Sequence, residues 1–353
     1  MRAQQQMDRK SSRSKVKSKP NGFALVLVLW VLSLLTIMAG SFALTMRRES
    51  TVVAGIKDNA GAVAAAEAGI AAAEMMLLDP DQNKRWRADG NIYQLDFGST
   101  KIRLRLLSEA GKIDINKAEL PLLQGLLAQA PVEEEQQAKL IGAIVDWRDQ
   151  DDLLSIEGAE KKEYKDAGKK YQPRNKPFQT VEELQMILGM DEQVFNWLEP
   201  IITVYSGQAQ VNLKLASSKV LKALPNQDAS LVDTFIAARL ESAKNDLPAP
   251  EFQLGLGGVS GASAPNETVT IVSEARMTDG ATADDTSPDE NSAVVIATVA
   301  KSDASQSVSL DGTPPEPFKI LKWQRNPANE ESLFTEAMSE LLVKQYAEPE
   351  LGG

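Results

Sequence analysis

The chain contains no cysteine and no histidine among its 353 residues. Disulfide bonds, zinc sites built on thiolate or imidazole ligands, and catalytic triads that need a histidine are therefore excluded. A cysteine nucleophile is excluded as well. Any active site would have to rely on carboxylates, lysines or tyrosines, and these form no convergent pattern along the chain. We therefore expect a protein that is not an enzyme.

Positive charge is scarce except at the N-terminus. Residues 1–22 hold seven basic residues and one acid, a net charge of +6, whereas the rest of the chain holds 31 basic and 48 acidic residues, a net charge of −17. Phosphate contacts require Lys and Arg, so this acidic body predicts no nucleic-acid partner. The composition suits a soluble extracytoplasmic domain.

Residues 23–46 carry no charged side chain, and three interpretations compete for this run of 24 residues. It could be a signal peptide cut after Ser41, but the apolar core of such a signal is only about 7–15 residues long. It could be an uncleaved anchor, because a helix of this length spans about 36 Å and crosses a bilayer. The excess of basic residues before it, against Arg47 and Arg48 after it, predicts a cytoplasmic N-terminus and a periplasmic body. This gives a single-pass protein of the inner membrane.

The third interpretation comes from the junction Gly22-Phe23. A basic leader, a glycine and a phenylalanine at the head of a long apolar helix resemble the type IV prepilin signal. The resemblance implies that a prepilin peptidase cuts between Gly22 and Phe23 and methylates the new amine of Phe23, and that the helix is retained.

The fifth residue after that junction is Leu27, where most pilin-like subunits carry a glutamate. A carboxylate in lipid needs a partner, thought to be the free amine of the subunit above. Leu27 therefore indicates a subunit at the filament tip. The alternative is an ordinary anchor, in which leucine is the expected residue.

Beyond the membrane the helical pattern continues to Leu78, and Asp79-Pro80 ends it. Ile56, Val63, Ile70 and Leu77 recur every seven residues among alanines, which predicts a seam that contacts a sheet and neighbouring subunits. A coiled coil is the alternative.

Alternating apolar and polar residues predict strands at 91–108, about the turn Gly98-Ser99, and again in "ETVTIVSEARMTDG", "NSAVVIATVAKSD" and "EPFKILKWQRN". About 140 mostly helical residues separate the two groups, as expected for a domain inserted into one sheet. Inside it, runs that lead into Asn116 and Asn212 and then into a short helix form an approximate repeat. Such units resemble SAM-like or helix-hairpin-helix modules.

An acidic segment, "IVDWRDQDDLLSIEGAE", places Asp146, Asp149, Asp151 and Asp152 within seven residues. Hard oxygen ligands suit calcium. The spacing is not that of an EF-hand, and a merely solvated acidic loop is the alternative.

The order of these motifs is specific. The leader, Leu27, "GKIDIN", "IVDWRDQDD", "GAE", "YQPRNKPFQTVEELQMILGM", "ITVYSG", "VNL" and "ILKW" follow one another as in the K subunit of the type II secretion system, also called general secretion pathway protein K, which is a minor pseudopilin. The likeness runs from Gly22 to about Trp323. The sequence thus resembles this family over most of its length.

The resemblance implies an α+β, type IV pilin-like fold, with a long N-terminal helix packed on an antiparallel sheet and a large inserted α-helical domain of SAM-like or helix-hairpin-helix repeats. Its implied partners are the I and J minor pseudopilins in a tip complex, the major pseudopilin, prepilin peptidase, the inner-membrane assembly platform and secreted exoproteins. It also implies calcium in the insert, with Asp149, Asp151, Asp152 and Glu160 as expected ligands. Lys161-Lys162 follow "GAE" where relatives are often acidic, which weakens one site.

The expected organisation follows from these assignments. It consists of a cleaved leader at 1–22, a transmembrane half-helix at 23–46, periplasmic helix and first strands at 47–108, the insert with two SAM-like units at 109–246, a linker at 247–266, further strands at 267–326, and a tail at 327–353 in which an amphipathic helix is expected. Two other functions remain open: a minor pilin of a type IV pilus, in initiation or adhesion, and a membrane-anchored periplasmic calcium-dependent binding module.

Overall fold

The computed structural model describes residues 23–82, 84–225, 228–252, 267–277, 292–302, 316–328 and 330–347. The chain divides into two compact units, Met1–Lys57 and Asp58–Gly353. The predicted leader, including Gly22, and residues 253–266 of the predicted linker lie outside the described residues.

Helix α1 spans Phe23–Leu77, 55 residues, and confirms the long N-terminal helix that the sequence predicts. The helix ends one residue earlier than expected, just before Asp79-Pro80. By length and composition its apolar part is sufficient to cross a membrane, with a mean hydropathy of 2.4 over its most apolar 18 residues.

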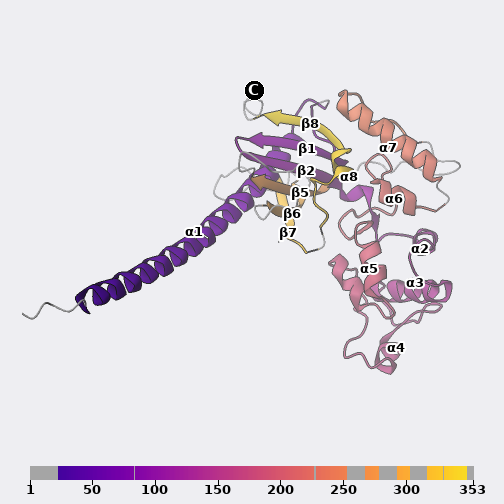
Figure 1. The fold of residues 1–353 in the computed structure, drawn as a ribbon. Helices are drawn as coiled ribbons and strands as arrows, with labels where there is room; N and C mark the ends of the chain where they lie inside the picture. Colours follow the sequence, from indigo (N-terminus) through magenta and orange to yellow (C-terminus); the bar gives the residue numbers. More distant parts are fainter. Residues whose placement is uncertain are drawn as a thin grey trace, which may run out of the picture. The chain divides into compact units, whose positions relative to one another are not determined.

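A six-stranded sheet forms the centre of the second unit, in the order β7-β6-β5-β2-β1-β8 (Figure 1). Neighbouring strands are antiparallel except for the parallel pair β1 and β8. The two-residue turn between β1 and β2 uses Gly98 with φ of 56°, a conformation that glycine adopts without strain. The strands are β1 (Asp89–Phe97), β2 (Thr100–Ser108), β5 (Thr268–Met277), β6 (Ser292–Lys301), β7 (Phe318–Arg325) and β8 (Leu342–Ala347). The first five confirm the predicted strands.

The second half of α1 packs on this sheet through small residues. Its buried positions are Ala62, Ala66, Gly69, Ile70, Ala73 and Leu77. The prediction of a seam through Ile70 and Leu77 is confirmed.

The two earlier positions of the seam are less buried than Ile70 and Leu77, and their expected contact with neighbouring subunits stays a prediction. Ile56 is 66% exposed and Val63 is only half-buried. A straight helix has 3.6 residues per turn, so a strict seven-residue spacing drifts off the contact face, and alanines at steps of three and four take its place.

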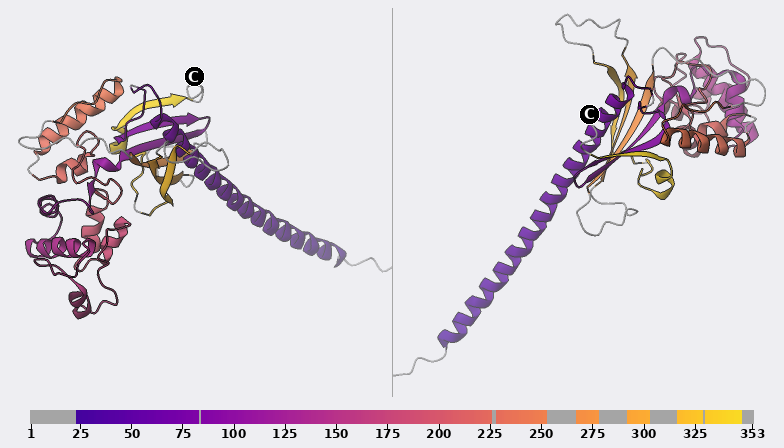
Figure 2. Two further views of the ribbon diagram at one scale, coloured as in Figure 1. Left: turned by 180° about the vertical axis from the view of Figure 1, so that it is seen from behind. Right: turned by 90° about the horizontal axis from the view of Figure 1, so that it is seen from above.

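The helical insert lies between β2 and β5, which are neighbours in the sheet. Figure 2 shows its helices gathered together. It has its own core, in which Trp147 and Tyr164 are fully buried. Its elements are η1 (Glu109–Gly111), β3 (Ile113–Asp114), α2 (Leu120–Leu127), α3 (Glu134–Arg148), α4 (Lys161–Asp166), η2 (Val181–Met186), α5 (Glu192–Leu198), β4 (Ile202–Thr203), α6 (Ser218–Ala223) and α7 (Ala229–Lys244).

The expected repeat is only partly visible in these elements. A short helix follows each asparagine, α2 after Asn116 and α6 after Asn212. The strand partner of β3 is β4, however, and the residues before Asn212 form no strand. The Asn212 side chain instead accepts a hydrogen bond from the Lys214 amide and closes a turn. The SAM-like character of the two units stays a prediction.

The C-terminal tail differs from the expected amphipathic helix. Only α8 (Glu336–Ser339) is helical, and the chain then enters β8 alongside β1. Leu333 and Met338 are buried, but on the sheet face opposite α1. A short isolated helix is marginal, whereas the edge of β1 offers backbone pairing and the sheet offers burial. The expected helix at 327–353 was therefore wrong over its described part.

Candidate functional site

The predicted processing site lies at the start of α1. Phe23 is the first described residue of the helix, and Leu27 follows one turn later with 58% of its surface exposed. All large apolar side chains from Leu25 to Met46 are exposed on the isolated chain.

Three polar side chains of this segment form hydrogen bonds within the helix. The hydroxyl groups of Ser33, Thr36 and Thr45 donate to the carbonyl groups four residues earlier at 2.8–3.1 Å. No water is present in a bilayer core, so this internal pairing is what a spanning helix needs.

The acidic cluster is built around the end of α3. Asp146 lies in the last turn of that helix and is fully buried, and it accepts a hydrogen bond from the Ser155 amide at 3.1 Å. Asp149 caps the helix. Glu160 is 7% exposed and precedes α4, where its amide donates to the Glu163 carboxylate.

The negative charges of these carboxylates raise one another's pKa. Burial, and then the negative charges of Asp146, Asp149 and Asp152, raise the pKa of Glu160 to about 7. Burial, Asp151 and Asp146 likewise raise the pKa of Asp149. Like charges at close range resist ionisation unless a cation or water compensates them.

The four predicted ligands are only partly brought together. Asp151 and Asp152 are exposed and hold the loop, since the Asp151 carboxylate accepts from the Leu153 amide at 2.9 Å and that of Asp152 from the Asn175 amide nitrogen at 2.8 Å. Across the described ranges, no three acidic side chains converge in the geometry of a formed metal site.

Two oxygens nevertheless fit a hard cation. Oδ1 of Asp149 and Oε1 of Glu160 are buried and have no hydrogen-bond partner among the described residues. Carboxylate oxygen is the donor that calcium prefers, so the chemistry of the donor set is compatible with that ion.

Asp146 was not among the predicted ligands, although it is the most buried carboxylate of the cluster. The sequence does indicate that Asp146 is buried, because it is the only charged residue in the otherwise apolar stretch "GAIVDW". A charged residue among buried positions is expected to have a specific partner.

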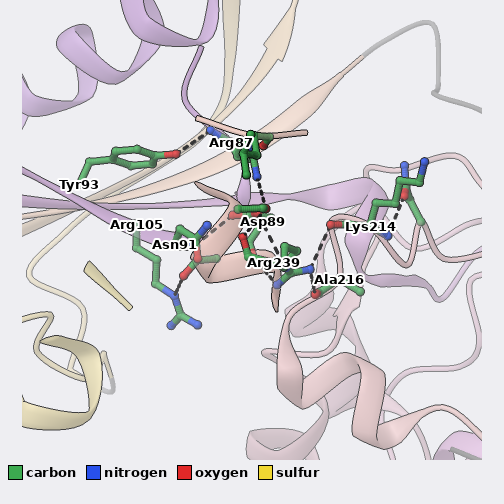
Figure 3. A network of polar contacts seen from close by, with 12 residues as sticks. Arg87, Asp89, Asn91, Tyr93, Arg105, Lys214, Ala216 and Arg239 are labelled. Atoms are coloured by element: carbon green, nitrogen blue, oxygen red, sulfur yellow. Dashed lines mark hydrogen bonds and ion pairs between the residues drawn. The ribbon is translucent and has the colours of Figure 1, made fainter. Parts of the chain in front are cut away.

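A second polar network joins the insert to the sheet (Figure 3). Arg239 on α7 is 3% exposed and Asp89 on β1 is 1% exposed. The guanidinium donates to the Asp89 carbonyl at 2.7 Å, and its Nε lies 3.6 Å from the Asp89 carboxylate. It also donates to the carbonyl groups of Lys214 and Ala216 at 3.0 and 2.7 Å.

This network, here called the Arg239 clamp, ties two other segments, β1 and residues 214–216, to one buried side chain of α7. Local sequence patterns do not predict this contact, because Asp89 and Arg239 are 150 residues apart. The only indication in the sequence is the position of Arg239. It lies at helical spacing from Val232, Phe235 and Ala243, and therefore on the buried face of α7.

Comparison with known proteins adds to this geometry. Residues 100–207 match the family model described as "Type II secretion system (T2SS), protein K". The curated type II secretion system protein K of Aeromonas hydrophila is 26% identical over 259 residues, 65% of this chain and 75% of the relative. That of Klebsiella pneumoniae is 24% identical over 217 residues, covering 55% and 66%, and that of Pseudomonas aeruginosa is 26% identical over 183 residues, covering 48% and 54%.

A solved structure is also similar, the crystal structure of the GspK-GspI-GspJ complex from enterotoxigenic Escherichia coli. It has a TM-score of 0.46 and 14% sequence identity, and it covers 80% of this chain and 99% of that one.

The family model and the curated relatives all show similarity to one component of type II secretion systems. Residues 100–207 therefore resemble the protein K family of minor pseudopilins. The expected family is thereby confirmed. Its relatives are structural subunits rather than enzymes.

Proposed function

We propose that this chain forms the tip of a periplasmic pseudopilus together with the I and J minor pseudopilins, and that it supports export of folded proteins across the outer membrane. The match of residues 100–207 to the protein K family model, together with the similarity to curated protein K sequences, is the observation that carries the proposal. The major pseudopilin, prepilin peptidase and the inner-membrane assembly platform are the further partners that this role requires, and secreted exoproteins are its cargo.

The features of α1 support the membrane part of this role. The helix is long and apolar enough to cross the inner membrane once, with the N-terminus in the cytoplasm and the body in the periplasm. Cleavage between Gly22 and Phe23 would free an amine at the head of the helix, and methylation would modify it.

The tip position has an electrostatic and a steric basis. Leu27 offers no carboxylate to the amine of a subunit above it, so nothing favours further stacking there. The insert between β2 and β5 adds a separately packed body to the head of the subunit and obstructs another copy from adding on top.

Deleting the gene in the source bacterium tests this function. We expect secreted enzymes to accumulate in the periplasm and to return to the medium when the wild-type gene is restored. A Leu27→Glu variant should restore secretion poorly, because its carboxylate lies in lipid without a partner, whereas Leu27→Met is the matched control that should restore it fully. Normal secretion in the deletion strain, with loss of surface pili instead, would contradict the proposal.

We propose in addition that the acidic cluster binds calcium. The buried oxygens of Asp149 and Glu160 would hold the ion with Asp151 and Asp152 after a local rearrangement of the loop, and the bound ion would relieve the repulsion among the carboxylates. Calorimetry on the full chain in detergent should show calcium binding that is lost on Asp149→Ala combined with Asp151→Ala. Absence of heat with the wild type would end this part of the proposal.

A further inference from the structure

The second unit contains a large cleft between the helical insert and the face of the sheet opposite α1. The volume of the cleft is about 1040 Å³. Pockets for small molecules usually measure about 300–1,000 Å³, so this cleft is large enough to hold a segment of a polymer. Its lining is separate from the acidic cluster at the end of α3.

The floor of the cleft carries apolar side chains from the middle of the sheet. Leu107 on β2, Val272 on β5 and Ile296 on β6 come from three neighbouring strands. Val272 and Ile296 are paired in register. Met190 and Phe195 add apolar surface from the insert. An apolar side chain that enters the cleft removes part of this surface from water, which favours binding.

Two long stretches that line the cleft contain acidic residues and no basic residue. They are residues 177–213 of the insert, which include η2 and α5, and residues 326–343 of the tail. In all, the lining holds seven acidic side chains, which are Glu109, Glu182, Asp191, Glu192, Glu199, Glu330 and Glu331.

The lining also holds four basic side chains, and two of them form ion pairs with these acids. Lys112 lies 2.8 Å from the Glu109 carboxylate. Lys322 lies 2.5 Å from the Glu182 carboxylate and so joins β7 to η2. With seven acidic and four basic side chains, the lining has a net charge of −3.

The other two basic side chains, Arg105 and Lys219, lie among carboxylates from both sides of the cleft. Burial lowers the pKa of Arg105, whereas the charges of Glu330 and Glu331 raise it. Burial raises the pKa of Glu330, Arg105 lowers it, and the charge of Glu199 on the insert raises it again. A cation held between the two sides of the cleft therefore relieves repulsion between carboxylates.

Basic residues on the same elements that do not line the cleft leave this charge negative. Most of them have acids of their own, as in the pairs Arg276–Glu274, Arg325–Glu67 and Lys222–Asp233 and, at one end of β6 and β7, in Lys301 and Lys319 beside Glu267 and Glu316. The cleft is thus an acidic site with an apolar floor, and a basic, partly apolar ligand complements it.

We propose that this cleft binds an extended segment of another protein in which basic side chains alternate with apolar ones. Successive side chains of an extended chain point in opposite directions, so one set covers the apolar floor while the other meets the carboxylates along the sides. The negative charge disfavours nucleic acid and anionic lipid, and a small polyamine leaves the apolar floor uncovered. Binding in the cleft requires neither the tip position nor calcium, so its test is independent of the secretion test.

The test uses the purified full chain in a nonionic detergent and a fluorescein-labelled peptide of alternating lysine and valine. With about eight residues, this peptide extends over about 26 Å as a strand. We expect fluorescence anisotropy to show saturable binding. A peptide with glutamate in place of lysine, and another with serine in place of valine, should each bind at least tenfold more weakly.

The charge contribution is tested with Glu192→Gln combined with Glu199→Gln. This change should lower the affinity about fivefold, within the range that two exposed ion pairs supply. Asp191 is kept, because its carboxylate accepts from the Val194 amide and caps α5. The matched control changes an exposed pair at the start of α3, Glu133→Gln with Glu134→Gln, and should leave the affinity unchanged.

The place of binding is tested with a single thiol, because the chain contains no cysteine. Asn196→Cys on α5, modified with a bulky maleimide, should abolish binding of the lysine-valine peptide. The same modification of Leu231→Cys, at a 60% exposed position on α7, should leave binding unchanged. Thermal unfolding of every variant should match the wild type, because the changed side chains are exposed.

Several outcomes would overturn the proposal. They are no binding of the lysine-valine peptide, equal affinity for the three peptides, equal losses in the two pairs of glutamine variants, or full binding after modification of the Asn196→Cys variant.

Discussion

The contact between α1 and the sheet predicts a sharp difference between two glycines of the same helix. Gly69 faces the sheet, and a Cβ atom there would lie 2.5 Å from the Ser273 hydroxyl and 2.9 Å from Cγ2 of Ile102. Gly55 has nothing within 4 Å of the same position. Valine at Gly69 therefore forces the helix off the sheet, whereas valine at Gly55 meets open space.

The size of the effect follows from two opposing contributions. Overpacking of a close contact costs about 1–3 kcal/mol, and valine, with three added methyl or methine groups, lies at the upper end. Replacing glycine in a helix returns a few tenths of a kcal/mol, because valine is a modest helix former. We expect Gly69→Val to lower the free energy of unfolding of the sheet domain by about 2–3 kcal/mol, which is about 4–12 °C in Tm for a domain of about 150–250 residues.

Hydrogen exchange with mass spectrometry on the full chain in detergent is the most direct assay. Gly69→Val should speed exchange in residues 62–77 of α1 and in β2 and β5, while α3 in the insert keeps its wild-type protection. Gly55→Val should leave both regions unchanged. Equal protection of residues 62–77 in the two variants would refute the packing described for α1.

Three further predictions concern other contacts. Arg239→Met should lower the free energy of unfolding by about 3–5 kcal/mol in denaturant titrations, because it leaves buried Asp89 without its guanidinium, and Asp89→Asn in the same chain should recover part of the loss; no loss would contradict the clamp. Because the pKa of Glu160 is raised from 4.5 to about 7, the folded chain binds more protons than the unfolded one between these values. Calcium-free protein should therefore become less stable as pH rises through this window, calcium should bind more weakly below about pH 7, and Glu160→Gln should reduce the pH dependence of stability; a slope of the opposite sign would refute the assignment. Phe334→Ala should cost about 3 kcal/mol and speed exchange in β8, because the buried ring lies between the guanidinium groups of Arg103 and Arg276 at 4.4 and 4.3 Å; unchanged protection of β8 would show that the tail is held otherwise.

Local patterns accounted for the elements whose signal lies within a few residues. The charge-free run that begins at Phe23 and the stop at Asp79-Pro80 bound α1 to within one residue. Alternation of apolar and polar residues predicted β5, β6 and β7, which pair in chain order. These elements are determined by residues that are close together in the chain, so the local sequence is sufficient to predict them.

Features that depend on distant residues were missed. The apolar residues of the tail fit a helix as well as a strand, and only the free edge of β1 decides for β8. The Arg239 clamp and the burial of Asp146 depend on contacts that form after the insert has folded. The alanines that replace the expected seam residues in α1 likewise reflect how closely the helix approaches the sheet.

The mature N-terminus is the measurement that tests the central claim most directly. Intact-mass and N-terminal peptide analysis of the chain isolated from inner membranes should show a polypeptide that starts at N-methylated Phe23. An intact Met1, or a chain that starts after Ser41, would contradict the assignment of this protein to the pseudopilus.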